Sequence, residues 1–392
     1  MNRYYNPVRT LEGPGSTNQL TGLLEEMGLE KRKVLLLVWS KNVLNNPGFS
    51  SLLKPEAGFE IQTVCFEASN PTVNQLFAVY EATRDFSPEA VVAVGGGSTM
   101  DVGKSLCCLY GHRIPDVDAL REMIREKNYG TPQAQWIGVP TTAGTGSEVT
   151  CWATIWDPEQ DAKRSVECRE NYAWAALVDP LLTEGMPLKL AVSSGLDAAA
   201  HAVESYWARG TNCVSRALAL EAVRLVMENM EGLLAGRQEA KEAMSRGSML
   251  AGLAFSNTKT TACHSISYPL TMHYQIPHGT AVSMLLAPLF KRNLPVTADG
   301  GRLAAALGAV DGEELGKRIR SILDRSGQPS TLKEWGVKRE DLPRMASLGL
   351  TKGRADNNPL DIDEAMILEI LEEIYDLKIY EQKGEQKNEI RI

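Results

Sequence analysis

The sequence lacks an excess of positive charge and any long apolar run. Its 392 residues contain 41 Lys and Arg against 49 Asp and Glu, which gives a formal net charge of −8. Nucleic-acid binding needs a basic face, so this balance excludes nucleic acid as a partner. No apolar stretch reaches the length that crosses a bilayer, and the opening residues, MNRYYNP, form no apolar signal region. We therefore expect a cytoplasmic protein with no membrane partner.

Cysteine is present without any pattern of pairing or metal ligation. The seven cysteines include no Cys-x-x-Cys pair, and Cys107 and Cys108 are adjacent. An odd number of scattered cysteines argues against a disulfide framework and against a cysteine-based zinc site. The thiols are expected to be reduced and to behave as small buried apolar side chains.

Histidine is scarce, yet three of the five histidines fall within residues 264–278. Upstream, Asp197 and His201 are four residues apart, which places both side chains on one face of a helix. The Asp-x-x-x-His pair alone fits better with polar side chains satisfied by their neighbours than with a metal site. One carboxylate and three imidazoles, from Asp197, His201, His264 and His278, suit a divalent ion such as Fe(II) or Zn(II).

The first half of the chain alternates apolar runs of strand length with helical stretches. Residues 34–39, 90–94 and 136–139 are such runs, and residues 72–83 have the pattern of an amphipathic helix. Continuous apolarity predicts strands buried on both faces, as in a parallel sheet between helices. Residues 1–184 are therefore expected to form a Rossmann-like α/β dinucleotide-binding domain, with ligands beyond the carboxyl ends of its strands.

The second half of the chain has a different character. Alanine, leucine, glutamate and methionine dominate, and strand-like runs disappear. We expect an all-helical domain over residues 185–392 with a frayed, charged end at 381–392, and its clearest helical patterns lie at 198–208, 216–230, 240–255 and 362–375.

Two glycine-rich loops follow the apolar runs of the first half. Gly95-Gly96-Gly97-Ser98 comes before a helical stretch, where free N–H groups and the helix dipole favour an anion. The sequence is neither a G-x-G-x-x-G fingerprint nor a Walker loop, and a tight strand-to-helix turn is the alternative. A second loop, Pro140 to Glu148, offers several hydroxyls and glycines. Two such loops after neighbouring strands suit a dinucleotide.

With these motifs assembled, the chain resembles the iron-dependent (group III) alcohol dehydrogenase family over essentially its whole length. The shared motifs are Gly95-Gly96-Gly97-Ser98-x-x-Asp101-x-x-Lys104, Pro140 to Glu148, Gly195-Leu196-Asp197 through His201 to Glu204, His264 through Pro277-His278-Gly279, and Asn357-Asn358-Pro359. The resemblance implies the dehydroquinate synthase-like fold of this family, an active site between the two domains, and a homodimer. It assigns the metal, Fe(II) or else Zn(II) or another divalent ion, to Asp197, His201, His264 and His278.

The resemblance also implies a nicotinamide cofactor and its binding residues. Lys163 matches, with Arg164 as its competitor, a lysine near the nicotinamide. The other cofactor residues carried over are Asn70, Gly95, Gly96, Gly97, Ser98, Asp101, Thr141, Thr142, Thr145 and Ser147. The metal would act as a Lewis acid on a carbonyl or alcohol, while the nicotinamide carries the hydride.

The chain departs from the family pattern at two places. The family's histidine four residues after the third ligand is Tyr268 here, so Tyr268, His273 or solvent would have to relay protons. After the first apolar run, the acid that NAD-preferring members often carry is replaced by Ser40, followed by Lys41. A hydroxyl and an ammonium accommodate a 2′-phosphate that an acid would repel, so we expect NADP(H) to be favoured over NAD(H), unless Lys41 is only a solvated surface lysine.

The segment around the third ligand resembles one branch of the family. Residues 258–271 and Glu204-Ser205-Tyr206-Trp207 are similar to members that reduce phosphonoacetaldehyde to 2-hydroxyethylphosphonate in phosphonate biosynthesis. The candidate substrate residues are Lys259, Thr260, Thr261 and Arg354, with the two threonines one turn before His264 if the helix is regular. The alternatives are a general short-chain alcohol dehydrogenase, a dehydroquinate-synthase-like lyase and a non-catalytic nucleotide-binding module.

Overall fold

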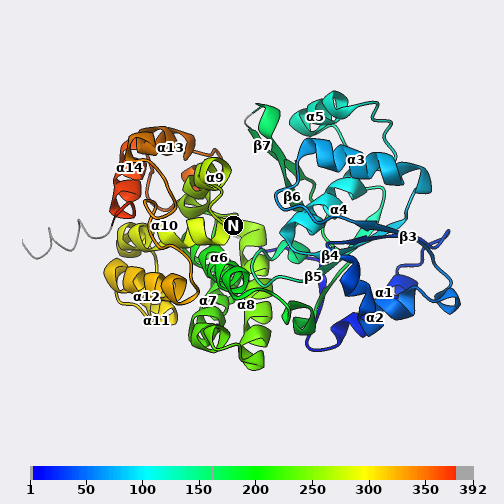
Figure 1. Ribbon diagram of the computed structural model, residues 1–392, viewed down its shortest axis with the longest axis horizontal. Helices are drawn as coiled ribbons and strands as arrows, with labels where there is room; N and C mark the ends of the chain where they lie inside the picture. The colour runs from blue at the N-terminus through cyan, green and yellow to red at the C-terminus, as the bar shows by residue number, and fades with distance from the viewer. Residues whose placement is uncertain (1–2, 161, 377–392) are drawn as a thin grey trace, which may run out of the picture. The chain divides into compact units, whose positions relative to one another are not determined.

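The computed structural model describes residues 3–160 and 162–376 (Figure 1). The charged end at 381–392 lies outside the described residues. Residues 5–185 form one compact unit, and residues 186–376 form another together with residues 3–4. The hydroxyl of Tyr4 donates a hydrogen bond of 3.2 Å to the carbonyl of Leu253, so the first described residues pack with the second unit.

The first unit is built on a six-stranded sheet with the order β1-β8-β5-β4-β2-β3. Every neighbouring pair is parallel, as the buried apolar runs predicted. The strands are β1 (Arg9–Glu12), β2 (Lys33–Val38), β3 (Glu60–Cys65), β4 (Ala90–Gly95), β5 (Gln135–Pro140) and β8 (Ala175–Val178). An antiparallel hairpin of β6 (Trp152–Asp157) and β7 (Ala162–Glu167) stands apart from this sheet.

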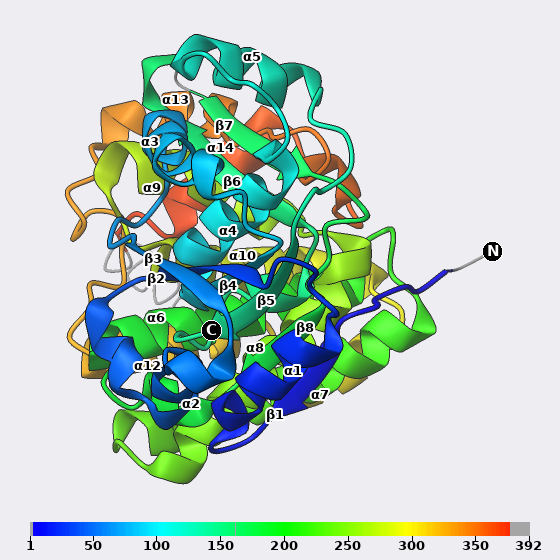
Figure 2. The ribbon, with the colours of Figure 1, turned by 90° about the vertical axis from the view of Figure 1, so that its right-hand side faces the viewer.

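Side chains alternate along each strand and fill two separate cores. On β2, Leu35 and Leu37 belong to one core, whereas Val34, Leu36 and Val38 belong to the other. Helices α3, α4 and α5 complete the first core, and α1 and α2 the second (Figure 2). These helices are α1 (Leu20–Glu26), α2 (Pro47–Leu52), α3 (Val73–Thr83), α4 (Gly97–Leu109) and α5 (Val117–Glu126). Connecting loops lie at the carboxyl ends of the strands.

The second unit contains helices and no strand among its described residues, which confirms the all-helical expectation. Its central helix, α6, packs against α7, α8, α9 and α10. The helices are α6 (Leu188–Trp207), α7 (Cys213–Leu234), α8 (Gln238–Thr258), α9 (Ala262–Tyr274), α10 (His278–Asn293), α11 (Gly300–Leu307), α12 (Gly312–Arg325), α13 (Leu342–Leu348) and α14 (Glu364–Glu373). Within the described ranges, none of the helices has both the length and the apolarity that a membrane crossing requires.

Candidate metal centre

Helix α6 presents an aspartate and a histidine from one buried face. Asp197 and His201 are one turn apart, and Nδ1 of His201 lies 3.8 Å from Oδ2 of Asp197. Both side chains are almost fully buried. Since a helix repeats every 3.6 residues, the four-residue spacing in the sequence is enough to bring them together.

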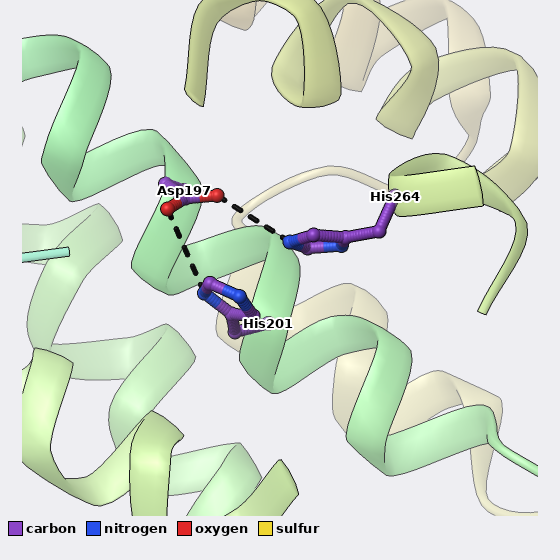
Figure 3. A group of neighbouring side chains, drawn as sticks. All are labelled: Asp197, His201 and His264. Carbon is purple, nitrogen blue, oxygen red and sulfur yellow. Dashed lines mark ion pairs between the residues drawn. The ribbon is translucent and has the colours of Figure 1, made fainter. Parts of the chain in front are cut away.

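Helix α9 supplies a third side chain to the same point. Nε2 of His264 lies 3.4 Å from Oδ1 of Asp197, so the carboxylate stands between the two imidazoles (Figure 3). One ligand atom from each of Asp197, His201 and His264 lies within 4.8 Å of the other two. Residues more than sixty positions apart in the sequence thus lie close enough together to bind one metal ion.

His278 is the first residue of α10, and its ring centroid lies 5.3 Å from that of His264. The next residue, Gly279, explains how α10 approaches so closely. A Cβ added to Gly279 would lie 2.0 Å from the carbonyl oxygen of Ser193 and 2.9 Å from Cβ of Asp197. Only glycine fits against α6 here, so Pro277-His278-Gly279 places the fourth predicted ligand beside His264.

The electrostatics of this group suit a bound cation. Burial alone would raise the pKa of Asp197, but the charges of the surrounding histidines hold it well below its usual range. Burial alone would lower the pKa of His264, but Glu204 and Asp197 raise it to about 10. Oδ1 of Asp197 and Nε2 of His264 are buried and make no hydrogen bond. A buried carboxylate oxygen and a buried imidazole nitrogen without hydrogen bonds fit a divalent ion such as Fe(II) or Zn(II).

Aromatic rings pack against two of the four side chains. Phe255 of α8 stacks on His201 with ring centroids 4.3 Å apart, and Tyr268 of α9 stacks on His278 at 6.0 Å. Tyr268 follows His264 by four residues and lies about 40° away around the helix, whereas His273 lies about 180° away. Of the two proton-relay candidates, only Tyr268 therefore adjoins the site.

A second carboxylate, Glu204, touches the site and was not among the predicted site residues. Its Oε2 pairs with Nδ1 of His264, and its Oε1 accepts from the hydroxyl of Thr261 at 2.8 Å and from the amide of Cys263 at 2.6 Å. The sequence does carry a signal for it. Glu204 follows Asp197 by seven residues and His201 by three, so all three share one face of α6.

Three of the predicted substrate residues, Lys259, Thr260 and Thr261, lie just before α9. The expectation that the two threonines belong to the helix of His264 is not met. Helix α8 ends at Thr258 and α9 begins at Ala262, so Thr260 and Thr261 lie in a turn and not one turn back on the helix of His264. The hydroxyl of Thr261 is fully buried, where it donates to Glu204 and accepts from the indole of Trp207. Because its hydroxyl makes both of these bonds, Thr261 supports α9 and does not contact a substrate.

Lys259, Thr260 and Arg354 remain near this turn with different exposure. Lys259 is half-buried with φ 62° and ψ 176°, and Thr260 is buried. Arg354 is half-buried and precedes the short helix Ala355–Asn357, in which the Asn357 side chain donates to the carbonyls of Thr258 and Thr260 at 2.8 and 3.0 Å. The Asn357-Asn358-Pro359 motif thus holds the turn in place.

In the first unit, the two glycine-rich loops lie side by side. Gly95 pairs in register with Pro140, and the amide of Thr141 donates to the carbonyl of Gly95 at 3.0 Å. A Cβ on Gly96 would approach Thr142 to 3.3 Å, and one on Gly97 would approach Thr145 to 2.9 Å. The glycines therefore serve packing between the loops as well as access to the N-terminus of α4.

Two further predicted cofactor residues, Asn70 and Asp101, adjoin these loops. The amide of Asn70 donates to the hydroxyl of Ser98 at 3.0 Å, which ties the loop after β3 to α4. Asp101 accepts from the hydroxyl of Ser147 at 3.0 Å and from the amide of Thr154 at 2.9 Å, and the fully buried Lys104 donates to Ser147 at 2.7 Å. Asp101 and Ser147 therefore hold the second loop and the β6–β7 hairpin to α4.

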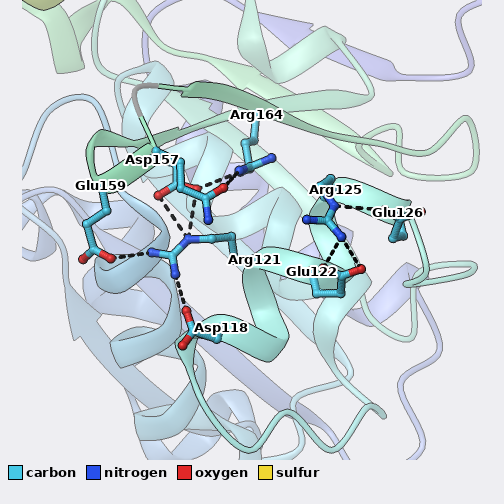
Figure 4. Close-up of polar contacts among 9 residues, drawn as sticks. Asp118, Arg121, Glu122, Arg125, Glu126, Asp157, Glu159 and Arg164 are labelled. Atoms are coloured by element: carbon cyan, nitrogen blue, oxygen red, sulfur yellow. Dashed lines mark hydrogen bonds and ion pairs between the residues drawn. The ribbon is translucent and has the colours of Figure 1, made fainter.

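The remaining cofactor candidates lie on β7 and after β2. Arg164 donates to Asp157 at 2.9 Å within an ion-pair network that includes Arg121 of α5 (Figure 4). Nζ of Lys163 lies 5.8 Å from the ring centroid of Trp156. Adjacent residues of a strand point to opposite sides, so the network occupies Arg164 and leaves Lys163 on the other face. Ser40 accepts from the amide of Asn42 at 3.3 Å at the start of the short helix Lys41–Asn45, and Lys41 is exposed.

Two sequence profiles cover most of the chain. Residues 7–180 match the profile of "Iron-containing alcohol dehydrogenase", and residues 191–375 match that of "Fe-containing alcohol dehydrogenase family, C-terminal". An NADPH-dependent butanol dehydrogenase from Clostridium saccharobutylicum is 28% identical over 389 residues, which is 96% of this chain and 98% of that protein.

Solved structures share the fold over nearly the full length. A 1,3-propanediol oxidoreductase superposes with a TM-score of 0.85 at 28% identity, covering 96% of this chain and 100% of the other. A sulfoacetaldehyde reductase from Bifidobacterium kashiwanohense, in complex with NAD+, gives a TM-score of 0.81 at 27% identity, covering 95% and 98%. Since both halves match the same family's profiles, the chain belongs to the iron-containing alcohol dehydrogenase family.

Proposed function

We propose that this chain is a metal-dependent aldehyde reductase that prefers NADP(H) and converts phosphonoacetaldehyde to 2-hydroxyethylphosphonate. Membership of an alcohol dehydrogenase family gives the reaction class. The single observation that supports the metal-dependent reaction is the buried group of Asp197, His201 and His264, with ligand atoms within 4.8 Å of one another and His278 alongside.

The chain's own residues would bind, orient and enclose the reactants. Asp197, His201, His264 and His278 would hold a divalent ion, which would supply Lewis-acid polarisation of a carbonyl while a bound nicotinamide supplied the hydride. Phe255 and Tyr268 stack on two of these imidazoles and shield them from water. The hydroxyl of Tyr268 is the side chain beside the site that we propose for proton delivery to the product oxygen.

The turn at Lys259 supports an anionic substrate. A lysine with φ 62° and ψ 176° occupies a backbone region that glycine alone adopts readily, at a cost of about 1–3 kcal/mol. Asn357 donates to the carbonyls on both sides of Lys259, and the hydroxyl of Thr258 donates to the Lys259 carbonyl at 3.0 Å. Strain of this kind gathers at binding sites, and a lysine in the turn that precedes the helix of His264 would suit a phosphonate or sulfonate. The sulfoacetaldehyde reductase among the similar structures is named for such an anionic aldehyde.

The alternative function is a general short-chain alcohol dehydrogenase. The similar butanol dehydrogenase and 1,3-propanediol oxidoreductase are named for uncharged substrates and favour it. Steady-state oxidation of NADPH with phosphonoacetaldehyde, sulfoacetaldehyde and propanal separates the two, using protein loaded with iron, zinc or manganese. We expect kcat/KM to be highest for phosphonoacetaldehyde. A clear preference for propanal would instead establish the general dehydrogenase, and no turnover of any aldehyde would leave a nucleotide-binding protein.

Replacing Lys259 with glycine should stabilise the protein and damage its use of the anionic substrate. Glycine relieves the backbone strain of the turn, but it also raises the conformational entropy of the unfolded chain. We expect a net increase of about 1 kcal/mol in the free energy of unfolding. Loss of the ammonium should lower kcat/KM for phosphonoacetaldehyde by about tenfold or more and leave propanal almost unchanged. Urea unfolding and steady-state kinetics measure the two effects, with exposed Lys317→Ala as control. Equal losses on both aldehydes would point to damage at His264 and against a phosphonate contact.

Replacing Ser40 with aspartate should shift the cofactor preference from NADPH toward NADH. Aspartate also caps a helix, so it preserves the hydrogen bond that Ser40 accepts from Asn42 while adding a charge that repels a 2′-phosphate. A coupling of about 1–3 kcal/mol corresponds to a change of about tenfold to a hundredfold in the ratio of kcat/KM values. The matched control is Ser40→Asn, which has the same shape without the charge and should keep the original ratio. Unchanged ratios in both variants would mean that the ribose is recognised elsewhere.

A further inference from the structure

Glu204 is a fully buried carboxylate with a complete set of donors around it. Its Oε1 accepts from the hydroxyl of Thr261 and the amide of Cys263, and lies 3.4 Å from the amide of His264. Its Oε2 faces Nδ1 of His264. Thr261, the residue before α9, provides no cap of its own, so Glu204 of α6 satisfies the free N–H groups at the start of α9.

The contact with Nδ1 determines what the other ring nitrogen of His264 presents. A carboxylate only accepts hydrogen bonds, so the proton of a neutral imidazole must reside on Nδ1 when it faces Glu204. Nε2 then carries a lone pair and points toward Asp197 at 3.4 Å. A carboxylate behind a ligating histidine fixes both the tautomer and the orientation of the ring.

We propose that Glu204 is the positioning residue that holds the His264 ring and keeps its proton on Nδ1, so that Nε2 faces the metal. This inference rests on the proposed metal site. A helix cap alone would need only Oε1, which already serves the backbone of α9. Oε2 instead contacts the imidazole of His264, and this contact gives Glu204 its proposed role in metal binding.

Glu204→Gln tests this role because glutamine keeps the shape of glutamate. If its oxygen caps α9, its NH₂ group faces Nδ1 and drives the His264 proton onto Nε2, where it blocks the metal. If the amide is reversed, its oxygen still accepts from Nδ1 but its NH₂ group opposes the amide of Cys263, which disfavours this arrangement. The favoured arrangement should raise the dissociation constant for Co(II) by about tenfold to a hundredfold. The constant would be measured by chelator competition on full-length, metal-stripped protein, together with the visible Co(II) spectrum, which should also change.

Two matched variants separate positioning from general damage. Glu373→Gln replaces a half-buried glutamate of α14 that pairs with Arg292, and should leave the Co(II) dissociation constant unchanged. Thr261→Val removes one donor to Oε1 but leaves Oε2 against the imidazole, so its loss of affinity should be smaller than that of Glu204→Gln. Wild-type affinity and spectrum in Glu204→Gln would overturn the inference. If wild-type protein failed to bind Co(II), the proposed metal site would fall and this role with it.

Nitrogen-15 NMR of the unaltered protein provides a test that needs no Glu204 variant. The chain has five histidines, so the His264 ring is assigned from the signal missing in His264→Gln. In zinc-loaded protein we expect Nδ1 of His264 to carry the proton and Nε2 to bear the metal. A proton on Nε2, or metal on Nδ1, would overturn the inference even if Glu204→Gln failed to fold.

Discussion

His278→Ala should abolish stable metal binding while leaving the helical unit folded. His278 stands at the start of α10 with its ring 5.3 Å from that of His264, and its half-buried side chain can be truncated without opening the core. A four-ligand site contributes about 10–16 kcal/mol, so losing one ligand should weaken binding by on the order of a hundredfold or more. Elemental analysis of purified protein and a Zn(II) dissociation constant measure the loss, and turnover should fall with metal content.

His273→Ala is the matched control, because His273 lies on the opposite side of α9 from His264. We expect this variant to retain metal and the wild-type pattern of circular dichroism. A full metal complement and normal turnover in His278→Ala would remove His278 from the site, and metal loss in His273→Ala would assign the ligand role to that residue.

Gly279→Ala should have the second large effect, on both stability and metal binding. The added methyl would lie 2.0 Å from a backbone oxygen of α6 and 2.9 Å from Cβ of Asp197, so α10 must move away. Overpacking against a backbone atom in a rigid core should cost at least about 3 kcal/mol of unfolding free energy. The same movement would withdraw His278 from its neighbours. Thermal unfolding and metal content measure the two consequences.

Gly301→Ala provides the control in the same unit. Gly301 lies on α11 with nothing within 4 Å of an added Cβ, so alanine there should be neutral or stabilise by up to about 1 kcal/mol. If Gly279→Ala melted at the wild-type temperature with full metal content, the close approach of α10 to α6 would not be what positions His278.

The central strands were predictable because their signal is local. The apolar runs at 34–39, 90–94 and 136–139 correspond to β2, β4 and β5, each buried on both faces. The four-residue strands β1 and β8 are too short to stand out. The sequence did not predict hairpin β6–β7, because β7 is mostly half-buried and polar. The position of the hairpin depends on contacts such as Thr154 with Asp101 and Arg164 with Asp157.

Helices with strong periodicity were also predictable, whereas α9 and α10 were not. The patterns at 216–230 and 240–255 lie within α7 and α8. Helices α9 and α10 are buried on nearly every side and each contains a proline, so neither shows an amphipathic stripe. The break between α8 and α9 depends on the strained backbone of Lys259, which Asn357 holds from almost a hundred residues away.

The sequence by itself predicted the parallel sheet and the two glycine-rich loops, because periodicity and loop motifs are properties of neighbouring residues. Its resemblance to a family supplied the reaction class and the candidate ligands Asp197, His201, His264 and His278. The tertiary structure alone decided that Tyr268 stacks on His278, that Thr261 supports α9, and that Glu204 faces Nδ1 of His264. These outcomes depend on how closely α6, α9 and α10 pack. That packing is set by contacts such as Gly279 against Ser193, which join residues far apart in the chain and leave no local pattern.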